Sequence, residues 1–353
     1  MSVLKNLRKQ IDRIDKNLTR LLNTRAAITL NIGRLKRKLG EGVYSSNREK
    51  EVLEKISRLN KGPLTADALK GIYREIMSCS LSLEKPLKVA YLGPEASFTH
   101  LAALRRFGSQ VKYAPLNSIT DVFGDVERGS ADYGVVPIEN SIEGAVSHTL
   151  DMFVDSDLKI CAEIILEITH NLLANCPKEK IRRVYSNPQV FGQCRIWLQE
   201  NLAKAETIEV SSTTRAAQIA SGQKSSACIA SSLAARVYKL KVIASGIEDS
   251  SHNITRFLVI ANNDTKASGN DKTSILFSIK DKVGALQDML LPFKKYKINL
   301  TKIESRPSKK KAWDYYFFLD LEGHKDNPQV RKALLDLEGK CKFLKILGSY
   351  PGV

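Results

Sequence analysis

The chain of 353 residues is long enough for two or three domains, and its 43% hydrophobic content is ordinary for a globular protein. No apolar run approaches the roughly 20 residues that a membrane span requires, and the first residues lack the apolar region of a signal peptide. The six cysteines form no CxxC pair, which disfavours a disulfide framework or a zinc site and fits a reducing cytoplasm.

The net charge of +17 is unevenly distributed along the chain. Residues 1–85 carry a net charge of +10, residues 86–262 are neutral, and residues 263–353 carry +7. Basic ends are compatible with nucleic acid, with small anions or with a solvated surface. Pro86 interrupts a helical pattern, and the polar run 262–271 is typical of a linker. We therefore expect three domains, over residues 1–85, 87–262 and 272–353.

The first segment has a hydrophobic seam whose members are spaced alternately by three and four residues. The seam consists of Leu4, Leu7, Ile11, Ile14, Leu18, Leu21, Ile28, Ile32, Leu35 and Leu39. It predicts one helix over residues 3–39, about 55 Å long, which exceeds a compact domain and indicates pairing with a second copy. A second helix is expected from Ser46 or Asn47, either of which can cap it, and Pro63 and Thr65 are expected to open a third.

Arg25 occupies the one slot of the seam that is not aliphatic. A guanidinium there needs a carboxylate partner or an anionic ligand, because an isolated buried charge is very costly. Lys36 lies three helical turns further along the same face, whereas Arg8 lies about 25 Å away and could reach only a partner chain's site. The second and third helices add Arg48, Glu49, Ser80 and Glu84. The pattern predicts a cationic pocket in a helix dimer.

Residues 1–85 resemble the all-α chorismate mutases that form intertwined dimers, on the motifs LRKQIDRID, LLNTRAAI, IGRLK, NREKEVL and IYREIMSCSLSLE. The resemblance implies that Arg25, Lys36 and Arg48 hold the carboxylates of chorismate, and that Lys36 also bonds the ether oxygen. The other implied contacts are Glu49 to the ring hydroxyl, Ser80 to a carboxylate or hydroxyl, and Arg8 in the partner's site. A Claisen rearrangement needs a compact substrate conformer and a donor to the oxygen that gains charge, without a nucleophile, base or metal.

Two positions depart from the pattern of these mutases. Glu84 stands where the bacterial pattern often has Gln, and a carboxylate can donate a hydrogen bond only when it is protonated. We therefore predict a mutase rate that falls with rising pH as Glu84 ionises, with Arg25 and Lys36 as the other catalytic candidates. Ser45 stands where the pattern often has an acid, and it is a candidate for substrate binding.

The second segment alternates predicted strands and helices, which is typical of an α/β fold. Strands are expected at 88–93, 133–141, 165–174, 182–187, 226–231 and in the second half of 246–260. Hydroxyl- and amide-rich loops such as 139–141 follow these strands, where ligands of α/β folds bind. The sequence has no Gly-rich nucleotide loop, metal-ligand spacing or hydrolase elbow. Its residues alone predict the binding of a small polar anion.

Residues 87–262 resemble prephenate dehydratases, on the motifs GPEASF, VPIENS, THNLL, SNPQVFGQC, SSTTRAA and GIEDSSHNITRF. The resemblance implies a two-lobed α/β fold similar to periplasmic binding proteins. It also implies that Thr255 is the essential threonine of this family. The implied substrate contacts are Asn140, Ser141, Arg256 and Phe257. Prephenate loses carbon dioxide and hydroxide together, so Thr255 is expected to donate a hydrogen bond to the departing hydroxide, with the proton source left open.

The third segment fits the βαββαβ plan of a ferredoxin-like α+β domain. Strands are expected at 272–280, 298–306, 312–321 and the C-terminal end, with helices from Gly284 to Tyr296 and over 327–339. The segment resembles the ACT regulatory domains of dehydratases, which implies that it binds phenylalanine. The implied effector contacts are Gly284, Ala285, Leu286, Glu304, Ser305, Arg306 and Pro307.

The order of the three segments resembles the bifunctional P-proteins of phenylalanine biosynthesis. That resemblance implies a cytoplasmic enzyme with chorismate and prephenate as substrates, L-phenylalanine as feedback inhibitor, and a homodimer or higher homo-oligomer. It implies no cofactor, nucleic acid or membrane. One alternative is a ligand-sensing transcription regulator with a basic helical N-terminus, although a helix-turn-helix needs short helices and this seam spans 36 residues. A second is an inactive paralogue that only senses amino acids.

Overall fold

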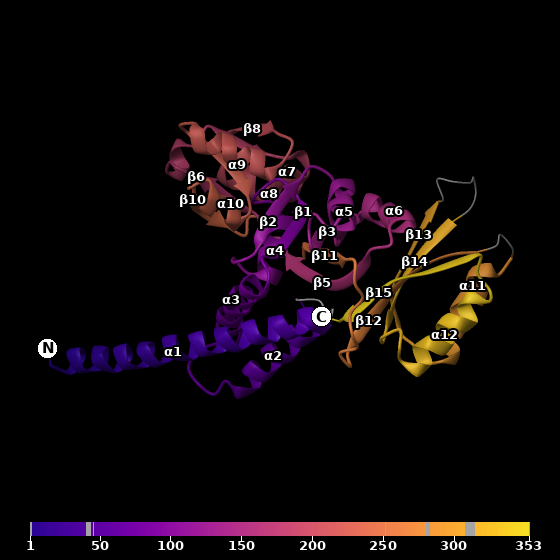
Figure 1. Cartoon of the computed structure of the whole chain (residues 1–353). Helices are drawn as coiled ribbons and strands as arrows, with labels where there is room; N and C mark the ends of the chain where they lie inside the picture. The colour runs from indigo at the N-terminus through magenta and orange to yellow at the C-terminus, as the bar shows by residue number, and fades with distance from the viewer. Residues whose placement is uncertain are drawn as a thin grey trace. The chain divides into compact units, whose positions relative to one another are not determined.

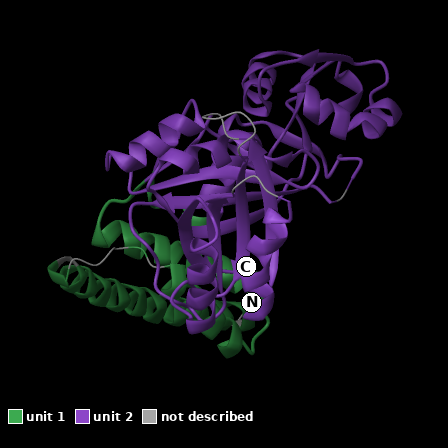
Figure 2. Cartoon of the chain, turned by 90° about the vertical axis from the view of Figure 1, so that its right-hand side faces the viewer, with its two compact units in different colours: residues 1–88, 106–112 green, residues 89–105, 113–353 purple. Residues whose placement is uncertain are grey.

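The computed structural model of the chain describes residues 2–39, 44, 46–250, 252–279, 283–307 and 315–352. The chain divides into two compact units (Figure 2). One comprises Met1–Lys88 with Arg106–Lys112, and the other comprises Val89–Arg105 with Tyr113–Val353. Among the helices of the described residues, none is both long and apolar enough to cross a membrane.

The smaller unit contains the three predicted helices, α1 (Ser2–Leu39), α2 (Ser46–Leu59) and α3 (Ala66–Glu84). Helix α3 begins as the sequence predicts, because the Thr65 hydroxyl accepts a hydrogen bond from the main-chain nitrogen of Ala68 at 3.2 Å. Helix α3 packs against the C-terminal half of α1 and α2 packs against α3, and the N-terminal half of α1 projects beyond them (Figure 1).

The hydrophobic seam of α1 faces solvent in the single chain. Leu4, Ile14 and Leu35 are 56%, 63% and 58% exposed. Burial of one such aliphatic side chain stabilises a protein by about 1.5–3 kcal/mol, and this gain is missing while the seam stays in water. A long row of exposed aliphatic residues is typical of a surface on which another helix packs.

The larger unit contains a six-stranded sheet in the order β2-β1-β3-β11-β5, with the short β4 paired to β3. Strand β1 runs parallel to β3, whereas β11 runs antiparallel to both β3 and β5. The strands are β1 (Lys88–Leu92), β2 (Lys112–Leu116), β3 (Tyr133–Asn140), β4 (Gly144–Ala145), β5 (Lys159–Glu167) and β11 (Ile254–Ala261). The helices are α4 (Phe98–Phe107), α5 (Ile119–Glu127) and α6 (Ser147–Asp155).

A second sheet of the larger unit has the order β10-β6-β9-β7-β8. Its strands are β6 (Asn171–Ala174), β7 (Arg183–Ser186), β8 (Glu206–Glu209), β9 (Ser226–Ala230) and β10 (Lys241–Ser245). The accompanying helices are α7 (Pro188–Gln193), α8 (Arg195–Asn201), α9 (Thr213–Gly222), α10 (Ser232–Val237) and the 3-10 turn η1 (Lys178–Lys180). The two sheets confirm the predicted two-lobed α/β architecture.

The single strand predicted over 165–174 is wrong, because the structure has two strands there. Strand β5 ends at Glu167 in the first sheet, and β6 begins at Asn171 in the second. Between the two strands, the main-chain nitrogen of His170 donates to a side chain, Glu248 Oε2 at 2.8 Å, instead of to a neighbouring strand. An unbroken apolar run does not reveal where a chain leaves one sheet for another. The sequence pattern also missed β2, β8 and β10, which are edge strands with mixed exposure.

The third sheet has the order β13-β14-β12-β15 and confirms the ferredoxin-like plan. Its elements are β12 (Asp271–Ser278), α11 (Ala285–Lys295), β13 (Leu300–Pro307), β14 (Tyr315–Glu322), α12 (Pro328–Glu338) and β15 (Phe343–Pro351). Helices α11 and α12 lie on the same face of this sheet (Figure 1). Of the predicted strands, residues 280 and 312–314 lie outside the described residues.

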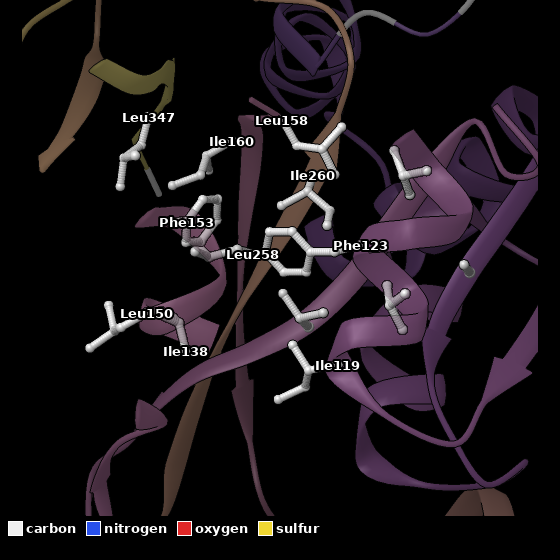
Figure 3. Close-up of a cluster of buried hydrophobic side chains, with 14 of the residues drawn as sticks. Ile119, Phe123, Ile138, Leu150, Phe153, Leu158, Ile160, Leu258, Ile260 and Leu347 are labelled. Atoms are coloured by element: carbon white, nitrogen blue, oxygen red, sulfur yellow. The ribbon is translucent and has the colours of Figure 1, made fainter. Parts of the chain in front are cut away.

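One hydrophobic core joins the first α/β sheet, α5 and α6 to the third sheet (Figure 3). The rings of Phe123 and Phe153 meet edge to face at 5.1 Å, and Leu347 of β15 belongs to the same cluster as Ile160 of β5. A β-carbon at Gly348 would collide with the main chain of Ile160, so glycine permits the close approach of β15 to β5. The ferredoxin-like domain therefore shares its core with the first lobe.

Candidate active sites and effector site

A cavity of about 640 Å³ lies among the helices of the smaller unit. Among the described residues its wall carries five basic side chains and two acidic ones, an excess of three positive charges. The predicted residues in this wall are Arg25, Lys36, Arg48, Glu49, Ser80 and Glu84. The structure thus brings six of the eight predicted mutase residues together, in an electrostatic setting that favours an anion.

Arg25 of α1 reaches across to α3. Its Nη1 donates to Ser80 Oγ at 2.5 Å, and Ser80 Oγ donates in turn to the main-chain oxygen of Ile76 at 2.9 Å. Among the residues that the structure describes, no carboxylate pairs with Arg25. Because a hydroxyl cannot neutralise a guanidinium, Arg25 retains its full charge for an anionic ligand in the cavity.

Lys36 of α1 and Glu84 of α3 face each other in the same cavity wall. Lys36 Nζ lies 3.7 Å from Glu84 Oε2, and the Glu84 side chain is only 8% exposed. Ser80 and Glu84 are one helical turn apart, so both side chains lie on the same face of α3. The cavity therefore has a cation and a nearly buried carboxyl group side by side.

Arg48 and Glu49 are adjacent in α2 but differ in their surroundings. Arg48 Nη1 lies 2.8 Å from Glu51 Oε2 in an ion pair whose side chains are 73% and 61% exposed. An exposed pair of this kind contributes little to stability, so Arg48 can exchange Glu51 for another anion at small cost. Glu49 is more enclosed, and its Oε2 accepts a hydrogen bond from the Tyr44 hydroxyl at 2.9 Å.

Two predicted mutase residues are not in the wall. Arg8 lies on the projecting half of α1, outside the cavity of its own chain, and Ser45 lies outside the described residues. The structure adds Tyr44, Arg74 and Arg106, which the sequence reasoning did not select. Arg74 belongs to the motif IYREIM and could have been found there, whereas no local signal marks Arg106.

A second group of polar side chains surrounds Thr255 of β11. Thr255 is nearly buried and stands opposite Asn140 in the register of β11 with β3. Asn140 Nδ2 donates to Thr255 Oγ1 at 2.8 Å and lies at the same distance from Asn253 Oδ1. Because Thr255 Oγ1 accepts the bond from Asn140, its own proton is available for a ligand oxygen.

The polar group continues from Asn253 toward the second lobe. Asn253 Nδ2 donates to Gln193 Oε1 at 3.1 Å, and Gln193 Oε1 lies 2.7 Å from His170 Nε2. Burial lowers the pKa of His170, and the bond to Gln193 only partly offsets it, so the imidazole is neutral at neutral pH. These three residues were not predicted, although each lies in a motif that carries the dehydratase resemblance.

Ser141 and Phe257 do not have the predicted geometry for contact with a substrate. Ser141 Oγ donates its one proton to the main-chain oxygen of His252 at 2.7 Å and accepts from the nitrogen of Ile254 at 2.9 Å. Phe257 is only 2% exposed. In this structure Ser141 holds the loop that precedes Thr255, and Phe257 is a core residue.

The contacts of Arg256 also contradict the prediction that it binds substrate. Its guanidinium binds Glu163 Oε2 at 2.7 Å, Asp320 Oδ2 at 2.6 Å and the Tyr350 hydroxyl at 2.9 Å. Burial lowers the pKa of Arg256, but Tyr350 and the two carboxylates outweigh it and raise the pKa overall. Neighbouring side chains of a strand point to opposite faces, so Arg256 ties β11 to the third sheet while Thr255 faces the polar group.

The two predicted effector motifs lie at the same end of the third sheet. Ser278, at the end of β12, and Arg306, near the end of β13, both stand opposite Tyr316 of β14. Gly284 has a φ of 75° and begins α11 immediately before Ala285. Strand β13 is the edge of its sheet among the described residues. An edge strand can pair with another chain.

Arg306 differs from the other predicted effector residues in its contacts. Its Nη1 donates to Ser147 Oγ at 2.7 Å, and its Nη2 lies 3.3 Å from Asp151 Oδ1, so the guanidinium binds α6. This geometry gives Arg306 a role in joining β13 to the first lobe.

Three family models match the chain in succession. Residues 7–85 match chorismate mutase type II, residues 89–265 match prephenate dehydratase, and residues 273–339 match the ACT domain. A bifunctional chorismate mutase/prephenate dehydratase from Aquifex aeolicus is 54% identical over 99% of this chain and 98% of its own length. The chain belongs to this bifunctional family. A second bifunctional relative, from Pseudomonas aeruginosa, is 44% identical over 99% of this chain and 97% of its own length.

The bifunctional chorismate mutase/prephenate dehydratase family also accounts for the fold. A solved prephenate dehydratase from Arthrobacter aurescens, in complex with L-Phe, matches with a TM-score of 0.70 and 31% identity. The match covers 75% of this chain and 90% of that one. The chain is therefore an enzyme with a helical mutase domain, a two-lobed dehydratase domain and an ACT domain. None of these matches supports the alternative of a transcription regulator.

Proposed function

We propose that this enzyme rearranges chorismate to prephenate in the cavity of α1, α2 and α3, and converts prephenate to phenylpyruvate at Thr255. The observation that carries the first assignment is Arg25, a cation within the hydrophobic seam whose side chain lines a cavity of about 640 Å³. Its only described side-chain partner is the neutral hydroxyl of Ser80. A cyclic dicarboxylate supplies the counter-charge that this wall, with its excess of three cations, lacks.

In the mutase site, Arg25, Lys36 and Arg48 hold the two carboxylates, so that the substrate is kept in its compact conformer. The ether C–O bond breaks while the new C–C bond forms, and charge accumulates on the ether oxygen. Lys36, whose Nζ lies 3.7 Å from Glu84 Oε2, donates a hydrogen bond to that oxygen, and Glu84 donates a second one when it is protonated. Glu49 accepts from the ring hydroxyl and Ser80 binds beside Arg25, with Ser45 as a further contact.

A second copy of the chain completes the mutase site in this proposal. The exposed seam of α1 supports a homodimer in which two long helices pack against each other. Arg8 then enters the partner's cavity, since it lies too far along α1 to reach its own. The exposed edge of β13 supports a further contact between copies at the ACT domain.

In the dehydratase site, the carboxylate of prephenate leaves as carbon dioxide, and its bonding electrons complete the aromatic ring. The ring hydroxyl leaves from the opposite side of the ring and takes up one proton to become water. The Thr255 hydroxyl donates a hydrogen bond to this leaving group, and Asn140 orients Thr255 from 2.8 Å.

The effector in this proposal is L-phenylalanine, bound at residues 284–286 and 304–307 of the ACT domain. The solved relative in complex with L-Phe supports the ligand. We expect L-phenylalanine to inhibit the dehydratase more than the mutase, because Arg256 connects the ACT sheet to the strand that carries Thr255.

The cytoplasm is the proposed location, which the six free cysteines and the biosynthetic role of the relatives support. The proposed domain boundaries are 1–85, 87–262 and 272–353, and the matches to 7–85, 89–265 and 273–339 support them.

A coupled assay tests the proposed function. The purified chain is supplied with chorismate, prephenate and phenylpyruvate are measured, and L-phenylalanine is then added. Arg25→Gln should lower the mutase rate by roughly 100-fold and leave the conversion of supplied prephenate unchanged. Arg20→Gln is the matched control, since Arg20 is exposed on the same helix and outside the cavity wall. Equal mutase rates in the two variants, or equal inhibition of both activities by L-phenylalanine, would contradict the proposal.

A further inference from the structure

Two residues in the wall of the mutase cavity come from outside the mutase domain. Arg106 and Phe107 form the last turn of α4, within the segment 89–265 that matches prephenate dehydratase and beyond the segment 7–85 that matches chorismate mutase. Both belong to the same compact unit as the cavity.

Arg106 contacts the carboxylate of Glu49 directly and through Tyr44. Arg106 Nη2 lies 3.3 Å from Glu49 Oε2, and Arg106 Nε donates to the Tyr44 hydroxyl at 2.6 Å. The Tyr44 hydroxyl donates to the same Glu49 Oε2 at 2.9 Å. The side chains of Arg106 and Glu49 are 21% and 11% exposed, so water screens this pair only weakly.

The chain after Arg106 is fixed against α3, which sets the position of the guanidinium. Gly108 has a φ of 71°, and a β-carbon there would lie 2.5 Å from the β-carbon of Ser78. The main-chain nitrogen of Gln110 donates to Ser78 Oγ at 3.0 Å, and Ser109 Oγ donates to Glu75 Oε2 at 2.6 Å. The turn at Gly108 and these two hydrogen bonds hold Arg106 in the wall of the cavity.

Both described contacts of the Glu49 carboxylate fall on one oxygen. Tyr44 and Arg106 each bind Oε2, so Oε1 can accept a hydrogen bond from a ligand. Without a cation beside it, a weakly screened carboxylate would also repel a dianionic substrate. Arg106 thus both orients Glu49 and cancels its charge.

We propose that Arg106 is a positioning residue of the mutase reaction, acting through Glu49 from a segment outside the mutase domain. This proposal rests on the assignment of Glu49 to the ring hydroxyl of chorismate. Arg106 selects the rotamer in which Glu49 Oε1 faces the substrate, and Tyr44 bridges the two side chains. The mutase site of this chain is complete only when the last turn of α4 is in place.

A double-mutant cycle in the full-length chain tests the proposal. Arg106→Gln should lower the mutase kcat/KM by about 10-fold, with dehydratase activity on supplied prephenate within about twofold of the parent. In a Glu49→Gln background, the same change should have an effect of less than about twofold, because the group that Arg106 positions is gone. Arg106→Lys should restore part of the loss. Arg105→Gln is the matched control, because Arg105 is its exposed neighbour in α4.

Three other outcomes would overturn the proposal, and each has a different meaning. A 10-fold loss that persists in the Glu49→Gln background means that Arg106 contacts the substrate itself rather than acting through Glu49. Equal losses of both activities, or a loss that Arg105→Gln reproduces, mean a general effect on folding or charge. If Glu49→Gln leaves the mutase unchanged while Arg25→Gln abolishes it, the Glu49 assignment is wrong and the proposed mutase function stands.

Discussion

Replacing Thr255 with valine removes one hydroxyl group from the proposed dehydratase site and keeps the branched shape of the side chain. In the parent, Thr255 Oγ1 accepts from Asn140 Nδ2 at 2.8 Å. Asn140 retains its contact with Asn253 Oδ1 at 2.8 Å, so the substitution costs about 1 kcal/mol of folding free energy. The domain should therefore fold, and any loss of activity reflects the missing donor.

The expected loss follows from the proposed role of Thr255 as donor to the departing hydroxide. Removal of one such donor typically lowers kcat by about 10²–10³-fold. The assay measures phenylpyruvate formed from supplied prephenate, and the consumption of chorismate by the same preparation serves as internal control. Thr255→Ser keeps the hydroxyl and should stay within about tenfold of the parent. A valine variant with parental dehydratase activity, or one that loses both activities together, would refute the reasoning.

Three further predictions concern other parts of the molecule. The mutase rate of the parent should fall with rising pH as Glu84 ionises, whereas Glu84→Gln should show a flat profile; a flat parental profile contradicts the donor role. Ile14→Glu should convert the oligomer to monomers in sedimentation experiments and abolish the mutase activity, whereas Lys16→Glu, which lies off the seam, should do neither. If the Ile14→Glu variant remains dimeric, the seam is not the dimer interface. Asp320→Asn should lower the free energy of unfolding by about 1.5–3 kcal/mol, because Arg256 loses a charged partner at 2.6 Å. An unchanged denaturation midpoint would contradict a stabilising role for the contact between Arg256 and Asp320.

The helices and the cationic wall of the mutase domain could be predicted from the sequence because both depend on local periodicity. The seam fixes which face of α1 is apolar, and the same spacing puts Arg25 and Lys36 on that face. The cap at Thr65 sets where α3 begins, whereas Ser46, a predicted cap of the second helix, is the first residue of α2 and its hydroxyl makes no capping bond within the described residues. Residues that share one helical face, such as Arg25 and Lys36, therefore line one cavity, whereas Arg74 and Arg106 of the same wall were missed.

The side-chain partners of Arg256 and Arg106 could not be predicted in this way. Arg256 stands next to Thr255 in the sequence, yet its partners Asp320 and Tyr350 come from the third sheet. Arg106 meets Glu49, 57 positions earlier in the sequence, only through the glycine turn that docks on α3. Neither contact leaves a periodic or compositional signal, because each depends on how distant segments pack.

The contacts of the ACT sheet explain how one ligand there could act on Thr255. Thr255 and Asn140 stand opposite each other on β11 and β3. Beside Thr255, Arg256 binds Asp320 of β14, and beside Asn140, Glu139 Oε2 lies 2.8 Å from Lys302 Nζ of β13. Both strands of the proposed dehydratase site are thus held by ion pairs from adjacent strands of the ACT domain. A ligand that shifts β13 relative to β14 would therefore act on both ion pairs, the one beside Thr255 and the one beside Asn140.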